Sequence, residues 1–390
     1  MKKILLSIAV AILKVIYIPI RLLKTKNKIT YISRQSNSEN IDFRLIRQEI
    51  EKEYLEYENV ILTKKIEPGI INNISYMVEL IKQMYHISTS KVVILDTYCI
   101  TVSVLKHKPE TKFIQIWHAL GAVKKFGLQS LDKPSGRRKD IAKVMCMHKN
   151  YNYVLAPSRK TAIYYKEAFN VEESKIAYIG MPRIDYILKD NVYIKDKIYN
   201  TYPILKEKIN ILYVPTFRKG EKVEIDDLVE NIDTKEYNLI IKLHPLDLKD
   251  YEYKEKDGVI YENKFSALDL MKIADKIVTD YSSLAMESAL LDIPLYFYTY
   301  DIEKYKQDPG LNFDFENEPI GKYQTNDARE LLKILNENYD QDILMNFKEK
   351  YIDVDTKDCA KQIVEFIMRL INDKEISIVG NESSKEKLGV

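Results

Sequence analysis

The chain has 390 residues, which is long for one ordinary hydrophobic core and suits two globular domains. Its hydrophobic fraction of 46% and charged fraction of 30% exclude a disordered chain and a polytopic membrane protein. With 60 basic and 58 acidic residues the formal net charge is only +2, so nucleic acid is not an expected partner and any anion site must be local. The three cysteines share no metal-ligand spacing, which disfavours a zinc site or a disulfide framework and fits a reducing cytoplasm.

Residues 1–28 form an apolar run flanked by lysines, MKKILLSIAVAILKVIYIPIRLLKTKNK. A signal peptide is disfavoured because the apolar run continues well past its small residues. A spanning helix is possible but unfavourable, because it would place the charge of Lys14 in the middle of the membrane. At about 100° per residue Lys3, Ser7, Lys14 and Arg21 form one narrow polar stripe. This pattern favours a membrane-associating helix that lies in the interface, with a spanning helix and a buried core helix as alternatives.

The rest of the chain alternates between strand-like and helical runs, in two sets. The first set has strands near 29–33, 58–62, 91–96, 112–116, 153–156 and 175–180, with helices between them. After a lapse around 190–208, the second has strands near 210–214, 237–243, 275–279 and 295–298, then closing helices near 326–337, 340–351 and 357–373. This is the βαβ pattern of doubly wound parallel sheets. We therefore expect an N-terminal domain at 29–200, a C-terminal domain at 201–373 and a polar tail at 374–390.

One strand end stands out as a candidate site. The apolar run 112–116 carries His118 just past its carboxyl end, which is where open α/β sheets bind ligands. The small-residue segment 119–122 should leave backbone amides accessible, and Lys124 and Lys125 add positive charge, a combination that suits a phosphate. The alternative is a structural histidine beside solvated lysines.

Other strand ends carry polar groups too. Arg183 lies on a turn after Gly and Pro, His244 follows a strand, and Ser282 and Ser283 precede a helix. The basic cluster at 137–150 is more typical of a solvated face than of a phosphate contact. Two α/β halves with such strand ends predict a cleft that binds a nucleotide.

Five motifs then carry a family resemblance. They are WHALGAVKKFG (117–127), GMPRIDYI (180–187), YVPTFR (213–218), KLHP (242–245) and TDYSSLAMESALLDIPLYFYTYDIEKY (279–305). In order and spacing they resemble the CDP-glycerol glycerophosphotransferases that build wall teichoic acid. Within that family the chain looks most like the glycerophosphate primases, because five residues separate His118 from Lys124.

The resemblance implies a GT-B-like fold, with two Rossmann-like domains facing a cleft. It implies that His118 takes the proton of the acceptor hydroxyl and that His244 stabilises or protonates the phosphate; an imidazole with an ordinary pKa suits either role. Substrate binding is carried over to Lys124, Arg183, Pro215, Thr216, Lys242, Asp280, Ser282 and Ser283. The implied reaction transfers glycerol phosphate from CDP-glycerol to N-acetylmannosaminyl-N-acetylglucosaminyl diphosphoundecaprenol and releases CMP. The implied location is the cytoplasmic face of the membrane, as a peripheral protein among other teichoic acid enzymes.

Other functions stay open at this point. A GT-B glycosyltransferase using a nucleotide sugar would share the fold, and a glycerol or ribitol phosphate transferase could act later in the same pathway. A catalytically dead scaffold is disfavoured because both histidines are present.

We expect no cofactor and no metal, since the motifs lack a pair of carboxylates at DxD spacing. Polymerases of the family carry an extra N-terminal domain, whereas here the first half begins at about residue 29, so we expect a single addition.

Overall fold

The structure is a computed structural model that describes residues 2–66, 70–218, 223–244, 247 and 253–372. Packing divides the chain into two units. Unit 1 comprises residues up to His118, Phe126–Asp185 and the described residues from Val354 on, and unit 2 comprises Ala119–Lys125 and Tyr186–Asp353. The expected polar tail at 374–390 lies outside the described residues. The expected cleft between the two halves stays a prediction.

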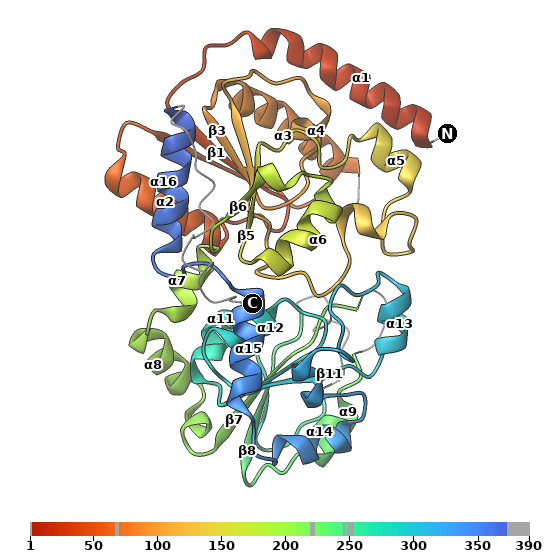
Figure 1. Ribbon diagram of the computed structural model, residues 1–390, viewed down its shortest axis with the longest axis vertical. Coiled ribbons are helices and arrows are strands. Elements are labelled where there is room, and N and C mark those ends of the chain that lie inside the picture. Colours follow the sequence, from red (N-terminus) through yellow and green to blue (C-terminus); the bar gives the residue numbers. More distant parts are fainter. Residues whose placement is uncertain (1, 67–69, 219–222, 245–246, 248–252, 373–390) are drawn as a thin grey trace, which may run out of the picture. The chain divides into compact units, whose positions relative to one another are not determined.

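Unit 1 is built on a six-stranded parallel sheet with strand order β2-β1-β3-β4-β5-β6 (Figure 1). Its strands are β1 (Lys28–Ser33), β2 (Glu58–Thr63), β3 (Val92–Leu95), β4 (Lys112–Gln115), β5 (Tyr153–Ala156) and β6 (Ile176–Tyr178). The central strands are fully apolar and buried, as in β3 (VVIL), because helices cover both faces of a parallel sheet. All six strands predicted from the first half of the sequence are confirmed.

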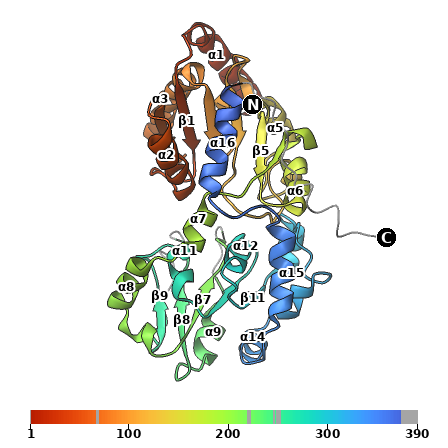
Figure 2. The same ribbon diagram turned by 60° about the vertical axis from the view of Figure 1, so that its left-hand side comes forward.

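The helices of unit 1 include one from the far end of the chain. They are α1 (Lys2–Arg21), α2 (Ile41–Glu53), α3 (Ile70–Thr89), α4 (Ile100–Val104), α5 (Lys139–Val144), α6 (Arg159–Phe169) and α16 (Cys359–Ile371), while α7 (Arg183–Leu188) joins the two units. Figure 2 shows α16 lying over the unit-1 sheet, where it packs beside α2 in the same core cluster. We expected this last helix in the C-terminal domain. Its apolar stripe completes the core of unit 1 instead.

Unit 2 contains a second six-stranded parallel sheet, with order β12-β11-β10-β7-β8-β9. The strands are β7 (Ile209–Val214), β8 (Tyr237–Ile241), β9 (Val259–Tyr261), β10 (Lys276–Thr279), β11 (Leu295–Tyr298) and β12 (Gln324–Thr325). Its longer helices are α8 (Val192–Thr201), α9 (Asp226–Asn231), α12 (Leu284–Ala289), α13 (Ile302–Gln307), α14 (Ala328–Leu335) and α15 (Gln341–Tyr351). The short edge strands β9 and β12, and α8 in the apparent lapse at 190–208, were not predicted from the sequence.

Both sheets reverse their strand order at one point. In unit 1 the order turns between β1 and β3, and in unit 2 it turns between β7 and β10. Ligands of open α/β sheets bind at the carboxyl ends of the two strands beside such a switch point. The residues just after β1 and β3, and just after β7 and β10, are therefore where each unit should carry its site.

Candidate active site

In unit 1 a strained turn presents His118. Trp117 follows β4 with a φ of 61°, which is left-handed and uncommon for a bulky residue. Its backbone N–H donates to Oε1 of Gln115 (2.9 Å), while Nε2 of this buried glutamine donates to the carbonyl of Thr97 (3.1 Å). The Trp117 ring stacks on Phe126 with centroids 4.7 Å apart. The side chain of Gln115 thus ties the turn after β4 to the end of β3.

The hydrogen bond of the His118 ring fixes its tautomer. Nδ1 lies 2.8 Å from the carbonyl oxygen of Asp96, and because a carbonyl only accepts, Nδ1 must carry the proton. In the neutral ring Nε2 is then the basic nitrogen. This is the arrangement a general base needs, with one ring nitrogen anchored and the other able to take a proton.

Asp96 itself is a buried carboxyl at the unit-1 switch point. It is 1% exposed; Oδ2 accepts from Nδ2 of Asn40 (2.8 Å), and Oδ1 has no hydrogen-bond partner among the described residues. Burial raises the pKa of Asp96 to about 6; the nearby Ser33 and Thr97 side chains lower it, and Asp42 raises it further. A perturbed carboxyl next to the His118 anchor is typical of a functional site.

The segment after His118 belongs to unit 2. Lys125 N donates to the carbonyl of Gly310 (2.9 Å), and Asn312 N donates to that of Val123 (2.8 Å). Gly121 is buried, and a Cβ there would come within 2.7 Å of Met286 Sδ. The small residue is thus required by close packing, which differs from the open turn expected from the sequence.

Lys124 lies beside the charged cluster of unit 2. Burial lowers the pKa of Lys124 to about 8; Asp280 and Asp301 raise it, and Arg218 lowers it further. Its Nζ lies 5.8 Å from the ring centroid of Tyr305. An ammonium group in this environment remains mostly protonated at neutral pH and can meet a phosphate charge.

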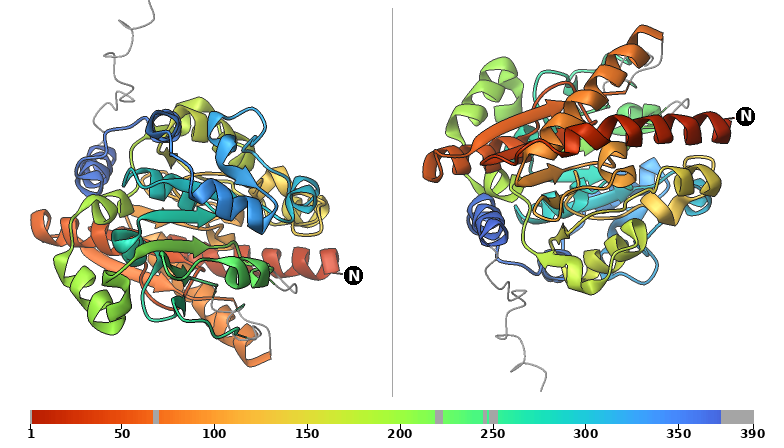
Figure 3. Two further views of the ribbon diagram at one scale, coloured as in Figure 1. Left: turned by 90° about the horizontal axis from the view of Figure 1, so that it is seen from below. Right: turned by 90° about the horizontal axis from the view of Figure 1, so that it is seen from above.

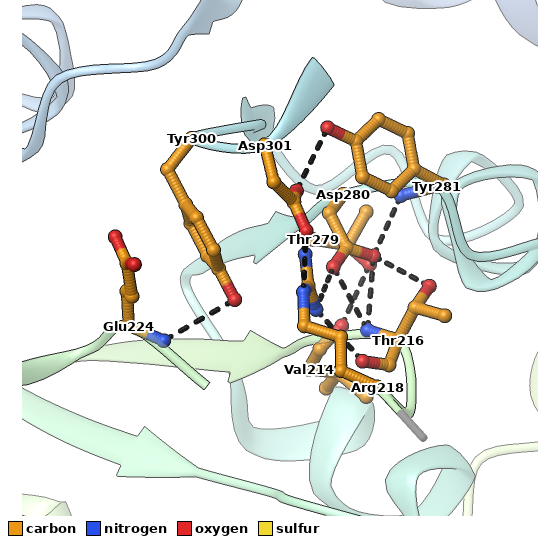
Figure 4. Close-up of polar contacts among 9 residues, drawn as sticks. All are labelled: Val214, Thr216, Arg218, Glu224, Thr279, Asp280, Tyr281, Tyr300 and Asp301. Carbon is orange, nitrogen blue, oxygen red and sulfur yellow. Dashed lines mark hydrogen bonds and ion pairs between the residues drawn. The ribbon is translucent and has the colours of Figure 1, made fainter. Parts of the chain in front are cut away.

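The unit-2 switch point holds a closed polar network, shown in Figure 4. Asp280 follows β10, and its carboxylate accepts from the backbone N–H of Thr216 (2.9 Å), the Thr216 hydroxyl (2.7 Å) and the backbone N–H of Tyr281 (2.6 Å). Nη1 of Arg218 adds an ion pair at 2.8 Å. Asp280 therefore fixes the turn that follows β7.

Arg218 is held from a second side by Asp301. Nε and Nη2 donate to the two oxygens of Asp301 at 2.8 and 3.0 Å, a bidentate pair, and the guanidinium lies 4.6 Å from the ring centroid of Tyr300. Burial alone would lower the pKa of Arg218, but the carboxylates raise it above its ordinary value. The hydroxyl of Tyr281 also donates to Asp301 (3.0 Å). The cation is thus matched by two anions.

The other predicted residues of unit 2 line the same sheet edge. His244 is exposed just after β8, and its ring lies 4.6 Å from that of Phe217. Pro215 is buried after β7, and Nζ of Lys242 donates to the carbonyl of Glu262 (3.3 Å).

The two serines lie at the start of α12. Oγ of Ser282 accepts from the backbone N–H of Leu284 (3.2 Å), while Ser283 is the N-cap residue without a side-chain capping bond. The structure therefore gathers Thr216, Asp280, Ser282, Ser283 and Lys124 in unit 2.

Arg183 is engaged within unit 1. Its guanidinium forms a salt bridge with Asp42 in the first turn of α2 (2.5 Å), and its backbone N–H donates to the same carboxylate (2.9 Å). Asp42 is nearly fully buried. In this structure the charge of Arg183 is used to join α7 to α2.

Several polar residues of these sites were not singled out from the sequence. They are Arg34, Asp42, Asp96, Gln115, Arg218 and Asp301. Arg34, Asp96 and Arg218 come within four residues after a strand, which is a signal that the sequence contains. Their importance depends on which strands are neighbours, however, and strand order is not visible in a single sequence.

Two parallel α/β units, each with polar groups at its switch point and with a histidine just past a strand end, are the features of a GT-B-like fold. The solved structure of the wall teichoic acid polymerase TagF has this fold: the alignment covers 96% of this chain and 98% of that one, with a TM-score of 0.71 and 20% identity.

Sequence comparisons give the family. The family model described as CDP-Glycerol:Poly(glycerophosphate) glycerophosphotransferase matches residues 15–369. The chain is 32% identical to a teichoic acid ribitol-phosphate primase of Bacillus spizizenii, over 79% of this chain and 82% of that protein. It is 29% identical to the teichoic acid glycerol-phosphate primase of Bacillus subtilis, over 90% and 93%. The chain belongs to the CDP-glycerol glycerophosphotransferase family, and it is an enzyme of teichoic acid synthesis.

Proposed function

We propose that the chain transfers one glycerol phosphate from CDP-glycerol to a lipid-linked disaccharide, N-acetylmannosaminyl-N-acetylglucosaminyl diphosphoundecaprenol, as a priming step. An acceptor hydroxyl attacks the phosphorus that bears glycerol, a new P–O bond forms, and the bond to the CMP phosphate breaks. The hydroxyl proton moves to Nε2 of His118, and CMP leaves. His244 stabilises or protonates the phosphate.

The hydrogen bond between His118 Nδ1 and the Asp96 carbonyl carries this proposal, because it leaves Nε2 as the basic nitrogen. Lys124, with Ser282 and Ser283 at the start of α12, supplies positive charge and hydroxyls for the donor phosphates. Thr216 and Asp280 maintain the backbone around them. Pro215 and Lys242 complete the proposed donor-binding edge, and Arg183 contributes by holding α7.

The relatives support a priming role. Three relatives that are 29 to 32% identical to the chain are primases for glycerol phosphate or ribitol phosphate. A second candidate donor is CDP-ribitol, since a ribitol-phosphate primase is among the relatives with 32% identity. Glycerol and ribitol differ in their hydroxyl groups and leave the phosphoryl chemistry unchanged.

A donor panel tests both points. Purified protein is given the lipid-linked disaccharide and excess CDP-glycerol, CDP-ribitol or a UDP-sugar, and products are read by mass spectrometry. We expect one added glycerol phosphate with CDP-glycerol and little further growth. A ladder of longer products would contradict the priming role, a ribitol phosphate product would change the donor, and a transferred sugar would contradict the phosphotransferase mechanism.

We further propose that α1 holds the protein on the cytoplasmic face of the membrane, as an in-plane helix. Among the described residues α1 is long and apolar enough to cross a membrane. One face of it packs on unit 1 through Val10 and Tyr17, whose hydroxyl bonds to His107 Nδ1 (3.0 Å), and the carbonyl of Ile20 accepts from Ser88 (2.6 Å). Figure 3 (right) shows α1 running along the outside of unit 1.

The opposite face of α1 is apolar and exposed. Ile4, Ile8, Ile12 and Val15 are each more than half exposed. One side of this helix packs on unit 1, and its outer side is apolar. This arrangement suits a helix that lies in the membrane surface better than a helix that spans the membrane. A spanning helix would have to give up the contacts of Val10 and Tyr17.

Alkaline carbonate extraction separates the two arrangements. We expect carbonate to release the full-length protein from membranes, and Ile8→Glu with Ile12→Glu to release it at neutral pH with turnover on a soluble acceptor unchanged. High salt alone should weaken attachment only partly. Resistance of the unaltered protein to carbonate would favour a spanning helix.

A further inference from the structure

Two arginines of unit 1 are connected through one tyrosine, Tyr98. The guanidinium carbon of Arg34 lies 5.2 Å from the ring centroid of Tyr98. Nη1 of Arg137 lies 2.7 Å from Sδ of Met145, and the carbonyl of Met145 accepts from the Tyr98 hydroxyl (2.8 Å). Both arginines also act on the buried ring of His148, whose pKa is lowered to about 3 by burial, Arg34 and Arg137, so this histidine is neutral. This part of unit 1 therefore carries two cations, the half-buried Arg34 and the exposed Arg137.

No carboxylate balances these charges in the described part of the chain. Neither Arg34 nor Arg137 forms an ion pair there, and Nε of Arg34 is buried without a hydrogen-bond partner. Three other arginines differ in this respect: Arg47 pairs with Glu39 and Glu51, Arg183 with Asp42, and Arg218 with Asp280 and Asp301. A half-buried arginine with an unused donor is costly unless a ligand supplies the anion.

Arg34 lies at the switch point of the unit-1 sheet. Arg34 directly follows β1, and its backbone N–H donates to the Thr97 hydroxyl (3.3 Å). Thr97 and Tyr98 continue the segment whose first residue, Asp96, anchors His118 by its carbonyl. Arg34 and the proposed base thus both contact one short segment after β3.

The segment around Arg137 borders the helix proposed to meet the membrane. Arg137 precedes α5 and Met145 follows it. Val144 and Cys146, on either side of Met145, pack into the cluster that contains Val10 and Tyr17 of α1. A ligand held by Arg137 therefore lies close to the part of unit 1 that carries α1.

We propose that Arg34 and Arg137 bind the diphosphate of the lipid-linked acceptor, which directs its sugar end toward His118. A diphosphate carries two or more negative charges and several acceptor oxygens, which suits two guanidinium groups. A sugar alone would leave both charges unmatched. This inference rests on the proposed function, and it assigns a phosphate site to Arg137, a member of the basic cluster at 137–150 that looked more like a solvated face in the sequence.

A pair of acceptors tests the site. The first is the disaccharide on a short alkyl diphosphate, and the second is the same disaccharide as an alkyl glycoside without phosphate. Binding of each is measured by calorimetry without donor, and kcat/KM is measured with saturating CDP-glycerol. Arg34→Gln and Arg137→Gln should each weaken binding and kcat/KM for the diphosphate acceptor by about 10-fold or more. Values for the glycoside and the KM for CDP-glycerol should stay within about twofold.

Arg138→Gln is the matched control, because Arg138 is next to Arg137 in the sequence, its side chain is 70% exposed, and it already pairs with Asp140. It should leave both acceptors unchanged, and Arg34→Lys should retain part of the diphosphate preference. Equal losses with both acceptors would show a merely structural role and overturn the assignment. Undiminished binding of the diphosphate acceptor to Arg34→Gln would overturn it as well.

Two further measurements distinguish this site from a lipid headgroup site and from a failure of the proposed reaction. Binding to phosphatidylglycerol vesicles should be the same for Arg34→Gln and the unaltered protein. Loss of vesicle binding with the acceptor preference intact would assign the arginines to lipid headgroups and overturn the proposal. Absence of turnover with both acceptors, together with weakened diphosphate binding in Arg34→Gln, would contradict the proposed donor and reaction while supporting this site.

Discussion

The switch points of the two units carry the same kinds of residues in different states. In unit 2, Arg218 pairs with two carboxylates, and Asp280 accepts three hydrogen bonds besides its ion pair. In unit 1, Arg34 has no carboxylate partner among the described residues, and Asp96 keeps a buried oxygen without a partner there. One network is complete, and the other is not.

This difference suggests different tasks for the two networks. A closed set of buried charges and hydrogen bonds fixes a backbone, so the unit-2 network should hold the turns that carry Thr216 and Ser282 in place. An arginine without an ion pair and a buried carboxyl with a raised pKa are typical of sites that bind a ligand or exchange a proton. Stability should therefore depend on Arg218, and acceptor chemistry on Arg34 and Asp96.

The largest expected effect comes from making the same substitution at both arginines. Arg218→Met leaves Asp280 and Asp301 buried without their cation and should cost about 3–5 kcal/mol of unfolding free energy. Arg34→Met separates no ion pair and should change stability by about 1 kcal/mol or less. Urea unfolding measures both. Similar losses at the two positions would remove the proposed distinction.

Next in size is the loss of either histidine. His118→Ala and His244→Ala should each lower kcat by about 100-fold or more, because each removes a group proposed to act in the transition state, while binding of CDP-glycerol changes little. His86→Ala, on α3 and half-buried, is a control that should keep turnover within about twofold. Normal turnover in His118→Ala would exclude its role as the base.

Much of the fold could be predicted from the sequence, because buried parallel strands are short apolar runs that stand out individually. Ten of the strands follow from such runs, whereas β9 and β12 are three and two residues long and lie at sheet edges. The position of α16 could not be predicted. Its apolar stripe shows that it is buried against a core, but it does not show which of two similar units provides that core.

The candidate site was predicted only in part. His118, His244 and the serines before α12 are visible because a reactive side chain directly follows an apolar run. The interactions of Arg183 with Asp42, and of Arg218 with Asp301, join residues 141 and 83 positions apart. Such pairs depend on the strand order and on the packing of α2 and the segment after β11, which a single sequence does not contain.

Asp96 provides a pH test of the incomplete network. Its folded pKa of about 6 lies above the ordinary 3.8, so the folded state retains the proton longer than the unfolded state, and stability should fall as pH rises from about 4 to 6. Asp96→Asn lacks this titration. The variant should be more stable than the unaltered protein by about 1–3 kcal/mol at pH 7, with the difference fading toward pH 4. Melting temperatures across this range measure it, and a difference independent of pH would contradict a buried, ionising carboxyl.

The smallest expected effect concerns Lys124 in unit 2. Burial lowers its pKa to about 8, so it is charged at pH 7 and loses its proton as pH rises through 8. If this charge meets the donor phosphates, the KM for CDP-glycerol should rise by up to about 10-fold between pH 7 and 9, as the protonated fraction falls. Lys124→Arg should keep its charge over this range and flatten the profile, and Lys125→Arg, at the exposed neighbouring position, should leave it unchanged. A pH profile of donor KM that is the same in Lys124→Arg and the unaltered protein would assign the titration to another group and remove Lys124 from the donor site.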